Sequence, residues 1–363
     1  MDVSEIARLL ADKIDVLVRE ILPNAKLCGH EWQVGSVAGE VGGSMCINNG
    51  TRRGVWKDFS GGKGGDALDL VAEVLFAGDK KRAVDWAKSW LGLDNLSPDR
   101  LKQVRQEAKK SRDDAQKSAR DSAVKRLKIA KAMWLASYPE IGGSPVDHYL
   151  MNRAIDLGRL PKLPQALRYA PELEHMNHET GEITKWPAMI ASITGEVDGK
   201  LSIVGVHRTY LAQDNYKVWR KAPVEKPKLT LGNWRGGYIP ISRGISGKTM
   251  KDAPEGDVVV IAEGIEDALS IALLYPERRV IASVSIGNMQ NIELPNAIEK
   301  VYIAVDNDHG NKQAEAAISN AIKKFYAEGR DVFTMRSPAG KDFNDFIQKY
   351  KTTAGDQVEQ VRR

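Results

Sequence analysis

The sequence has 363 residues, of which 42% are hydrophobic and 28% charged, and its formal net charge is +5 at pH 7. This composition excludes a wholly disordered chain and allows two or three domains with apolar cores. No apolar run approaches the roughly 20 residues that span a bilayer, so we expect no membrane segment. With only two cysteines, Cys28 and Cys46, a disulfide scaffold is not expected, and a reducing cytoplasm is favoured.

Residues 1–96 read as a first, small α+β domain. A helix is predicted at about 3–20, followed by short glycine-rich strands at roughly 31–59 and by two further helices after the glycine turn at 61–65. Trp32, Trp56 and Phe59 could stack on single-stranded bases, and the alternative, which we favour, is that they form the core of a small domain. Residues 97–131, rich in Lys, Arg, Asp and Gln, predict a charged helical linker.

Residues 132–256 read as a second, mixed α/β domain. Pro145 begins a predicted helix, and the apolar runs 188–193 and 201–208 predict two strands paired around an Asp198–Gly199 turn. Lys and Arg are concentrated at 217–235, as they are at 100–131. Basic tracts of this kind suit a protein that holds a polyanion.

Residues 257–350 predict an α/β domain, and 351–363 a C-terminal tail. Apolar strands are expected at 258–262, 280–283, 301–305 and 331–335, with helices at 265–274 and 312–328. Strands that are apolar on both faces and alternate with helices indicate a parallel sheet covered by helices. Such sheets bind their ligands at the carboxyl ends of the strands.

Carboxylates follow two of these strands directly. Glu263 comes just after the strand that ends at Ala262, and Asp306 and Asp308 come just after the strand that ends at Val305. Mg²⁺ prefers a few carboxylates together with water and substrate phosphate. We therefore predict a divalent metal site, Mg²⁺ or Mn²⁺, whose ligands and catalytic residues are Glu263, Asp306 and Asp308. The alternative is that each acid caps a helix.

The segments EGIEDALS and AVDNDHGNKQA resemble the TOPRIM domain of primases, topoisomerases and some nucleases. The resemblance covers roughly 257–350 and implies that Glu263, Asp306 and Asp308 bind metal. It adds Asp342 as a metal ligand and Asp267 and Lys341 as nucleotide- or DNA-binding residues. Asn344 stands where the primase branch usually has a second aspartate, which leaves open whether Asp345 completes a second metal site.

Upstream, residues 186–240 resemble the basic subdomain that precedes the core in bacterial, phage and plasmid primases. Gly205-Val-His-Arg208 and the stretches around Lys221 and Lys228 carry this likeness. It implies that Arg208, Lys221 and Lys228 contact nucleotide phosphates or the template backbone, and the alternative is a solvated basic surface. A lone strand histidine such as His207 is more often structural.

The N-terminal domain resembles the zinc ribbon of primases in outline only. Cys28, His30 and Cys46 echo the start of a ligand set, but the usual final Cys-x-x-Cys pair is missing. We therefore expect no zinc and a degenerate, zinc-ribbon-like DNA-binding domain, as in some phage and plasmid primase-like proteins.

Together these resemblances imply a DNA primase, a DNA-directed RNA polymerase that joins ribonucleoside triphosphates into short primers on a single-stranded DNA template. A phage or mobile element is the expected setting, and a separate replicative helicase is a candidate partner, because no helicase motif is visible. Two alternatives stay open: a TOPRIM metal-dependent nuclease, and a non-catalytic nucleic-acid-binding accessory protein of replication or recombination.

Overall fold

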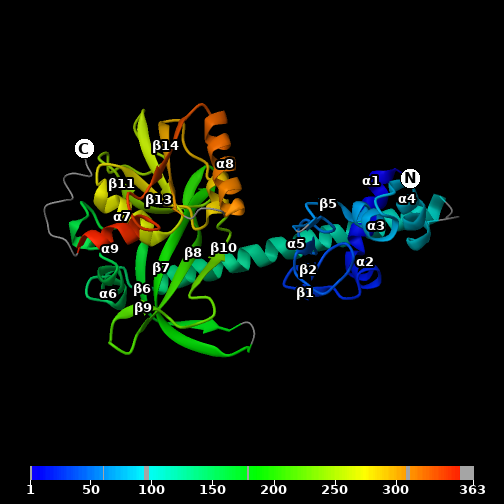
Figure 1. Ribbon diagram of the computed structural model, residues 1–363, viewed down its shortest axis with the longest axis horizontal. Coiled ribbons are helices and arrows are strands. Elements are labelled where there is room, and N and C mark those ends of the chain that lie inside the picture. Colours follow the sequence, from blue (N-terminus) through cyan, green and yellow to red (C-terminus); the bar gives the residue numbers. More distant parts are fainter. Residues whose placement is uncertain (1, 60, 94–97, 178–179, 308–310, 352–363) are drawn as a thin grey trace. The chain divides into compact units, whose positions relative to one another are not determined.

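The computed structural model describes residues 2–59, 61–93, 98–177, 180–307 and 311–351 (Figure 1). Its contacts divide the chain into two compact units, Met1–Ser122 and Ala123–Arg363. Helix α5, Pro98–Ala136, contains the boundary between them. This helix lies where the sequence predicts a charged helical linker. None of the helices among the described residues is both long and apolar enough to cross a membrane.

The first unit is a small antiparallel sheet with helices packed on it. Its strands follow one another in the order β1-β2-β3-β4-β5. Trp32 and Trp56 are 3% and 2% exposed and belong to its core, as expected for a small domain, whereas Phe59 is 58% exposed and does not. The elements of this unit are α1 Val3–Asp12, α2 Ile14–Ile21, β1 Lys26–Cys28, β2 Glu31–Val34, β3 Met45–Asn48, β4 Trp56–Asp58, β5 Gly64–Gly65, α3 Ala67–Phe76 and α4 Lys80–Trp90.

The second unit begins with an antiparallel sheet of long strands, in the order β10-β8-β7-β6, with β9 paired to β8. Strands β7 and β8 meet at the predicted turn, where Asp198 and Gly199 both have positive φ angles of 50° and 72°, the conformation that short hairpin turns require. The elements of this part are α6 Pro145–Asn152, the 3₁₀ helix η1 Leu157–Arg159, β6 Leu167–Met176, β7 Ile183–Val197, β8 Lys200–Gln213, β9 Trp219–Lys221 and β10 Lys228–Gly232.

The second sheet of this unit has the order β11-β13-β12-β14-β15. Strands β12, β13, β14 and β15 are parallel, and β11 joins the edge antiparallel to β13. The predicted α/β class and parallel sheet are thereby confirmed. The elements are β11 Ile239–Arg243, β12 Asp257–Ala262, α7 Ile265–Leu274, β13 Arg279–Ala282, the 3₁₀ helix η2 Ile286–Asn291, β14 Ile298–Val305, α8 Lys312–Ala327, β15 Asp331–Arg336 and α9 Phe343–Lys351.

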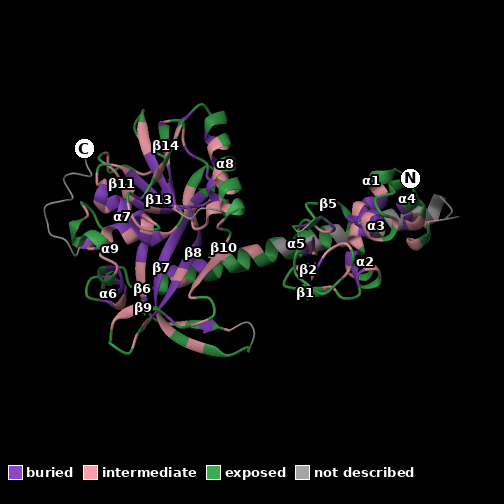
Figure 2. Ribbon diagram, viewed as in Figure 1, coloured by how far each residue is buried: buried purple, intermediate pink, exposed green. Residues whose placement is uncertain are grey.

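Helices cover both faces of this parallel sheet, which explains why β12 and β13 are buried along most of their length, whereas β15 at the edge is largely exposed. Val260 and Ala262 pack in the cluster that contains α7 and α9. Their neighbours Val259 and Ile261 point the other way and pack with Phe325 of α8, because successive side chains of a strand face opposite sides. Figure 2 shows buried strands in the sheet and a more exposed helix α8.

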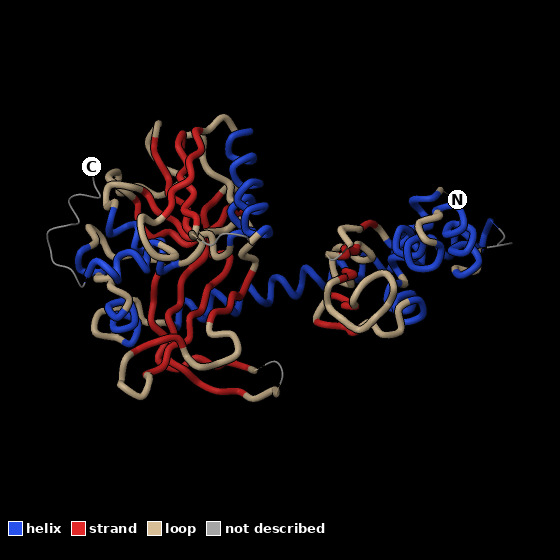
Figure 3. The backbone as a smooth tube through the Cα atoms, in the orientation of Figure 1, coloured by secondary structure: helices blue, strands red, loops and turns tan. Residues whose placement is uncertain are grey.

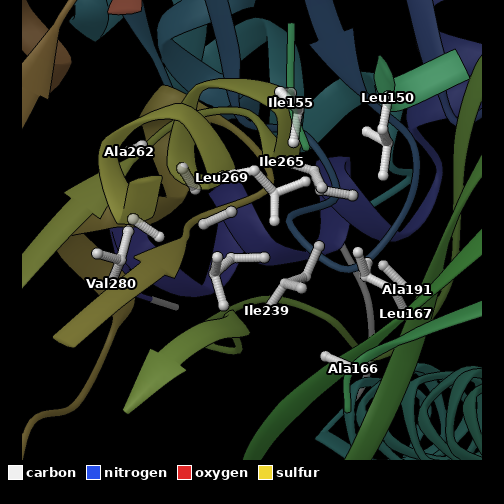
Figure 4. Close-up of a cluster of buried hydrophobic side chains, with 14 of the residues drawn as sticks. Leu150, Ile155, Ala166, Leu167, Ala191, Ile239, Ala262, Ile265, Leu269 and Val280 are labelled. Atoms are coloured by element: carbon white, nitrogen blue, oxygen red, sulfur yellow. The ribbon is translucent and has the colours of Figure 1, made fainter. Parts of the chain in front are cut away.

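The two sheets of the second unit share one apolar core. A single buried cluster contains Leu150 of α6, Ile155 just after it, Ala191 of β7 and Leu269 of α7. Figure 4 shows these side chains converging. This shared core fixes the antiparallel strands next to the carboxyl ends of the parallel ones. The tube in Figure 3 shows the two sets of strands within the unit.

Candidate active site

Two predicted acids meet at the carboxyl edge of the parallel sheet. Strands β12 and β14 are direct parallel neighbours, with Ile261 opposite Ile303, so that Glu263 and Asp306 leave adjacent strand ends. Both line a cavity of about 460 Å³. Its other lining residues are Arg153, His207, Lys221, Lys228, Ile239, Gly264, Ile265, Glu266, Asp267, Val284, Lys341, Asp342 and Asn344.

The strand β13 also contributes to the cavity at its carboxyl end. Val284 lines the cavity with a φ angle of 73°. A β-branched residue in this left-handed conformation is a genuine outlier, and such strain tends to be found where a site requires it. No sequence pattern indicated this residue.

A hydrogen-bonded clamp brings the late motif beside Asp306. The amide nitrogen of the Asn307 side chain donates to the carbonyl oxygens of Ser337 and Gly340, at 3.1 and 2.9 Å, and its backbone N–H donates to the carbonyl oxygen of Lys341 at 2.7 Å. Lys341 and Asp342 therefore line the same cavity as Asp306. The carboxylate of Asp342 also accepts the backbone N–H of Asp345 at 2.7 Å and so caps α9.

Asp267 lies among these carboxylates. Burial, followed by the negative charges of Asp342 and Asp306, raises the pKa of Asp267 to about 7. Its Oδ1 atom accepts the backbone N–H groups of Phe343 and Asn344, at 2.7 and 3.2 Å. Asp267 thus has a structural role at the start of α9 in addition to lining the cavity.

The donor set fits a magnesium or manganese ion. Burial is the main cause of the raised pKa of Asp267, but the negative charges of Asp342 and Asp306 add to it, and a cation relieves such repulsion between carboxylates. Mg²⁺ takes one or two carboxylates and completes its shell with water and phosphate. Within the described ranges, no three His, Cys, Asp or Glu side chains come close enough to enclose an ion by themselves. Asp308, the third predicted ligand, lies outside the described residues.

The side chain of Asn344 forms its hydrogen bonds with other groups of the protein. It is 1% exposed, and its amide nitrogen donates to the carbonyl oxygen of Arg153 and to Oγ of Ser270, at 2.9 and 3.0 Å. Its Oδ1 accepts from Gln348 at 3.0 Å. Asp345 accepts the backbone N–H of Lys341 at 3.1 Å. These bonds give the side chain of Asn344 a packing role, which an aspartate could not fill.

We therefore expect Asn344→Asp to destabilise the second unit by about 3 kcal/mol, because two donors are lost and a charge faces the carbonyl oxygen of Arg153. It should not strengthen Mn²⁺ binding. Urea unfolding and Mn²⁺ titration check both points, with Asn320→Asp, an exposed asparagine of α8, as the control. Native stability together with tighter Mn²⁺ binding would contradict this assignment.

Strand register places the basic residues on one face. Lys228 of β10 pairs with Thr209 of β8, and Lys221 of β9 pairs with Leu211. Since residues two apart share a face of a strand, both lysines lie on the same side as His207, and all three line the cavity. Arg208 must then face the other side.

The structure accordingly places Arg208 away from this cavity. Its guanidinium donates to the hydroxyl of Tyr210 and to the carbonyl oxygen of Thr230, at 3.3 and 3.4 Å. His207, which we expected to be structural, is the member of this pair that lines the cavity. Alternation along the strand shows that the two residues diverge, but only the tertiary packing decides which one faces the site.

Sequence reasoning missed Glu266. Its carboxylate, 5% exposed, accepts from Nζ of Lys228 at 2.8 Å and from the hydroxyl of Tyr149 at 2.7 Å. Burial acts to raise its pKa, but the ammonium groups of Lys228 and Lys221 hold the pKa well below its usual range. A second acid beside Asp267, in the first turn of the largely apolar helix 265–274, was the available signal.

His207 is uncharged at neutral pH, because burial and then the charge of Lys228 lower its pKa to about 4. An unfolded histidine titrates near 6.5, so between these values the unfolded chain binds more protons and stability falls as the pH falls. When the pH is lowered from 7 to 4.5, we expect the free energy of unfolding to fall by about 2 kcal/mol more in the native chain than in the variant His207→Gln. Urea unfolding at both pH values measures this difference, and equal losses would contradict it.

In the first unit, Cys28 is exposed and Cys46 is partly exposed, on β1 and β3. Burial, followed by the charges of Glu31 and Cys28, raises the pKa of the Cys46 thiol. His30, the other residue that echoes a zinc ligand, is exposed in the turn between β1 and β2.

Two family models match the second unit. Residues 258–352 match the Toprim domain, and residues 124–241 match a domain of unknown function, DUF7146. A comparison with curated proteins found no significant match.

Among solved structures, the chain is similar to a DNA primase domain from Pseudomonas aeruginosa, with 14% identity, 65% of this chain and 77% of that one covered, and a TM-score of 0.39. It is similar to the DnaG primase catalytic domain bound to ssDNA, with 16% identity, coverage of 67% and 80%, and a TM-score of 0.39. It is also similar to the primase fragment of the bacteriophage T7 primase-helicase protein, with 18% identity, 48% of this chain and 65% of that one covered, and a TM-score of 0.28.

The domain match and the geometry agree on one segment. The matched residues begin within β12, include the strand ends that carry Glu263 and Asp306, and extend through α9. Residues 258–352 of this chain are a Toprim domain.

Proposed function

We propose that this chain is a DNA primase, which joins ribonucleoside triphosphates into short RNA primers on a single-stranded DNA template. The observation that carries the proposal is the cavity at the carboxyl edge of the Toprim sheet, where an acidic wall, Glu263, Asp306 and Asp342, faces the lysines Lys221 and Lys228. Nucleotidyl transfer needs both kinds of charge, because cations hold the polyphosphate and carboxylates hold the divalent metal.

The acidic wall would hold the metal. Glu263, Asp306 and Asp342 supply carboxylate oxygens, and Asp308 is the further ligand that the sequence predicts. When bound, Mg²⁺ or Mn²⁺ would neutralise charge on the triphosphate and help to position it. The crowded carboxylates, of which Asp267 has its pKa raised to about 7, make this edge of the sheet favourable for a cation.

The basic wall would hold the substrate. Lys221, Lys228 and Lys341 line the cavity and are placed to receive the triphosphate of the incoming nucleotide. Glu263, exposed at the end of its strand, is the carboxylate that we assign to take the proton of the primer 3′-hydroxyl when it does not bind metal. Arg208 and the first unit remain candidates for contacts with the template rather than with the nucleotide.

A primer-synthesis assay tests the proposal. The purified full chain is incubated with single-stranded templates of several sequences, Mg²⁺ or Mn²⁺, and labelled ribonucleoside triphosphates, with and without a replicative helicase. We expect short products that require both template and triphosphates. Degradation of DNA without triphosphates would instead indicate the nuclease, and neither product nor degradation in any condition would favour the non-catalytic accessory protein.

A further inference from the structure

A three-part network lies behind the basic wall. Tyr149 of α6 and Lys228 of β10 donate to the two different oxygens of the Glu266 carboxylate, at 2.7 and 2.8 Å. Glu266 is 5% exposed and Tyr149 is 2% exposed. The network therefore ties three separate elements, α6, α7 and β10, to one buried charge.

Lys221 and Lys228 lie on the same face of their strands and repel each other. Lys221 is exposed overall, yet partial burial of its ammonium group, followed by the charge of Lys228, lowers its pKa. Glu266 acts in the opposite direction, and Arg153 is the remaining charge that faces Lys221 and lowers its pKa. Without the carboxylate of Glu266, the ammonium group of Lys228 would lose the group to which it donates, and the repulsion between the two lysines would be less compensated.

We propose that Glu266 is a positioning residue. Its carboxylate, anchored by the hydroxyl of Tyr149, fixes the ammonium group of Lys228 beside that of Lys221 before the polyphosphate of the substrate arrives. The inference rests on the proposed function only in naming a nucleoside triphosphate as the ligand. A preorganised cation loses less freedom on binding than a mobile one.

Binding of ATP as a function of pH tests the inference without requiring catalysis. Adenine does not titrate between pH 7.5 and 9.5, so changes in affinity in this range report on the protein. Calorimetry with the full chain and Mg²⁺ measures the pH at which the affinity of the native protein begins to fall as Lys221 loses its proton. In Glu266→Gln, the loss of affinity should begin about one pH unit lower, because an opposite charge shifts a pKa by about one unit or more.

Two further variants separate positioning from folding. Glu266→Asp keeps the charge and should retain most of the native profile, whereas the exposed Glu315→Gln of α8 should match the native profile throughout. If Glu266→Gln does not fold, Tyr149→Phe carries the test, with a smaller shift in the same direction. Identical profiles for the native chain and Glu266→Gln, or no ATP binding by the native chain, would overturn the inference. ATP binding with the expected shift but no primer synthesis would overturn only the proposed function.

Discussion

Asp306→Asn is expected to lower primer synthesis on the order of a thousandfold or more while leaving the chain folded. Asp306 follows the end of β14 and lines the cavity in which we place the metal. Because this metal would neutralise charge on the triphosphate, the loss of one of its carboxylate ligands is costly. The charge of Asp306 also raises the pKa of Asp267. Removing that charge relieves repulsion, so the metal-free variant should be as stable as the native chain or slightly more stable.

Asp331→Asn is the matched control for this variant. Asp331 is exposed and begins β15, at the amino end of the strand that neighbours β14, so it lies on the same sheet but at the opposite edge. Its replacement should leave primer synthesis within about twofold of native, as for surface substitutions in general. Substantial synthesis by Asp306→Asn, with native stability, would contradict the assignment of the acidic wall.

Lys228→Met is expected to destabilise the second unit by about 3 kcal/mol at pH 8, because it leaves the buried carboxylate of Glu266 without its closest counter-charge. The cost should depend on pH. In the native chain the pKa of Glu266 is lowered. The ionised carboxylate therefore stabilises the fold at pH values above the pKa that it has in the unfolded chain, and this contribution is lost as the pH falls. In the variant, burial is expected to raise that pKa, and stability should fall as the pH rises through about 4.5.

Urea unfolding at pH 8 and at pH 4.5 measures this difference, which should be largest at pH 8. The double variant Lys228→Met with Glu266→Gln removes both charges and should recover most of the lost stability. Lys226→Met, an exposed lysine in the loop before β10, is the control. A cost that is equal at both pH values, or that remains in the double variant, would show that the ion pair is not its cause.

The Toprim sheet could be predicted from sequence because its signal is local. The strands β12, β13 and β14 are largely apolar on both faces, and helix 265–274 begins and ends where predicted. The edge strand β11 was not predicted. It contains Pro240, and its place in the sheet depends on antiparallel pairing with β13, more than thirty residues later along the chain. Pairing between strands so far apart in the sequence produces no local pattern of apolar residues from which it could be predicted.

The acidic side of the site was also easier to predict than the basic side. Glu263 and Asp306 follow strands directly, and the carboxyl edge of a parallel sheet is a general binding position. The basic residues depend on the register of β8, β9 and β10, which places His207 at the cavity and Arg208 away from it. Glu266 was missed because its partners, Tyr149 and Lys228, come from segments 117 and 38 residues away.

A crystal structure of the chain soaked with Mn²⁺ and a nucleoside triphosphate tests the central claim most directly, because manganese is located by its anomalous scattering. We predict an anomalous peak in the cavity at the ends of β12 and β14, with carboxylate oxygens of Glu263, Asp306 or Asp342 at about 2.1 Å and the triphosphate on Lys221 and Lys228. A bound triphosphate without manganese at these carboxylates, or manganese found only elsewhere on the chain, would contradict it.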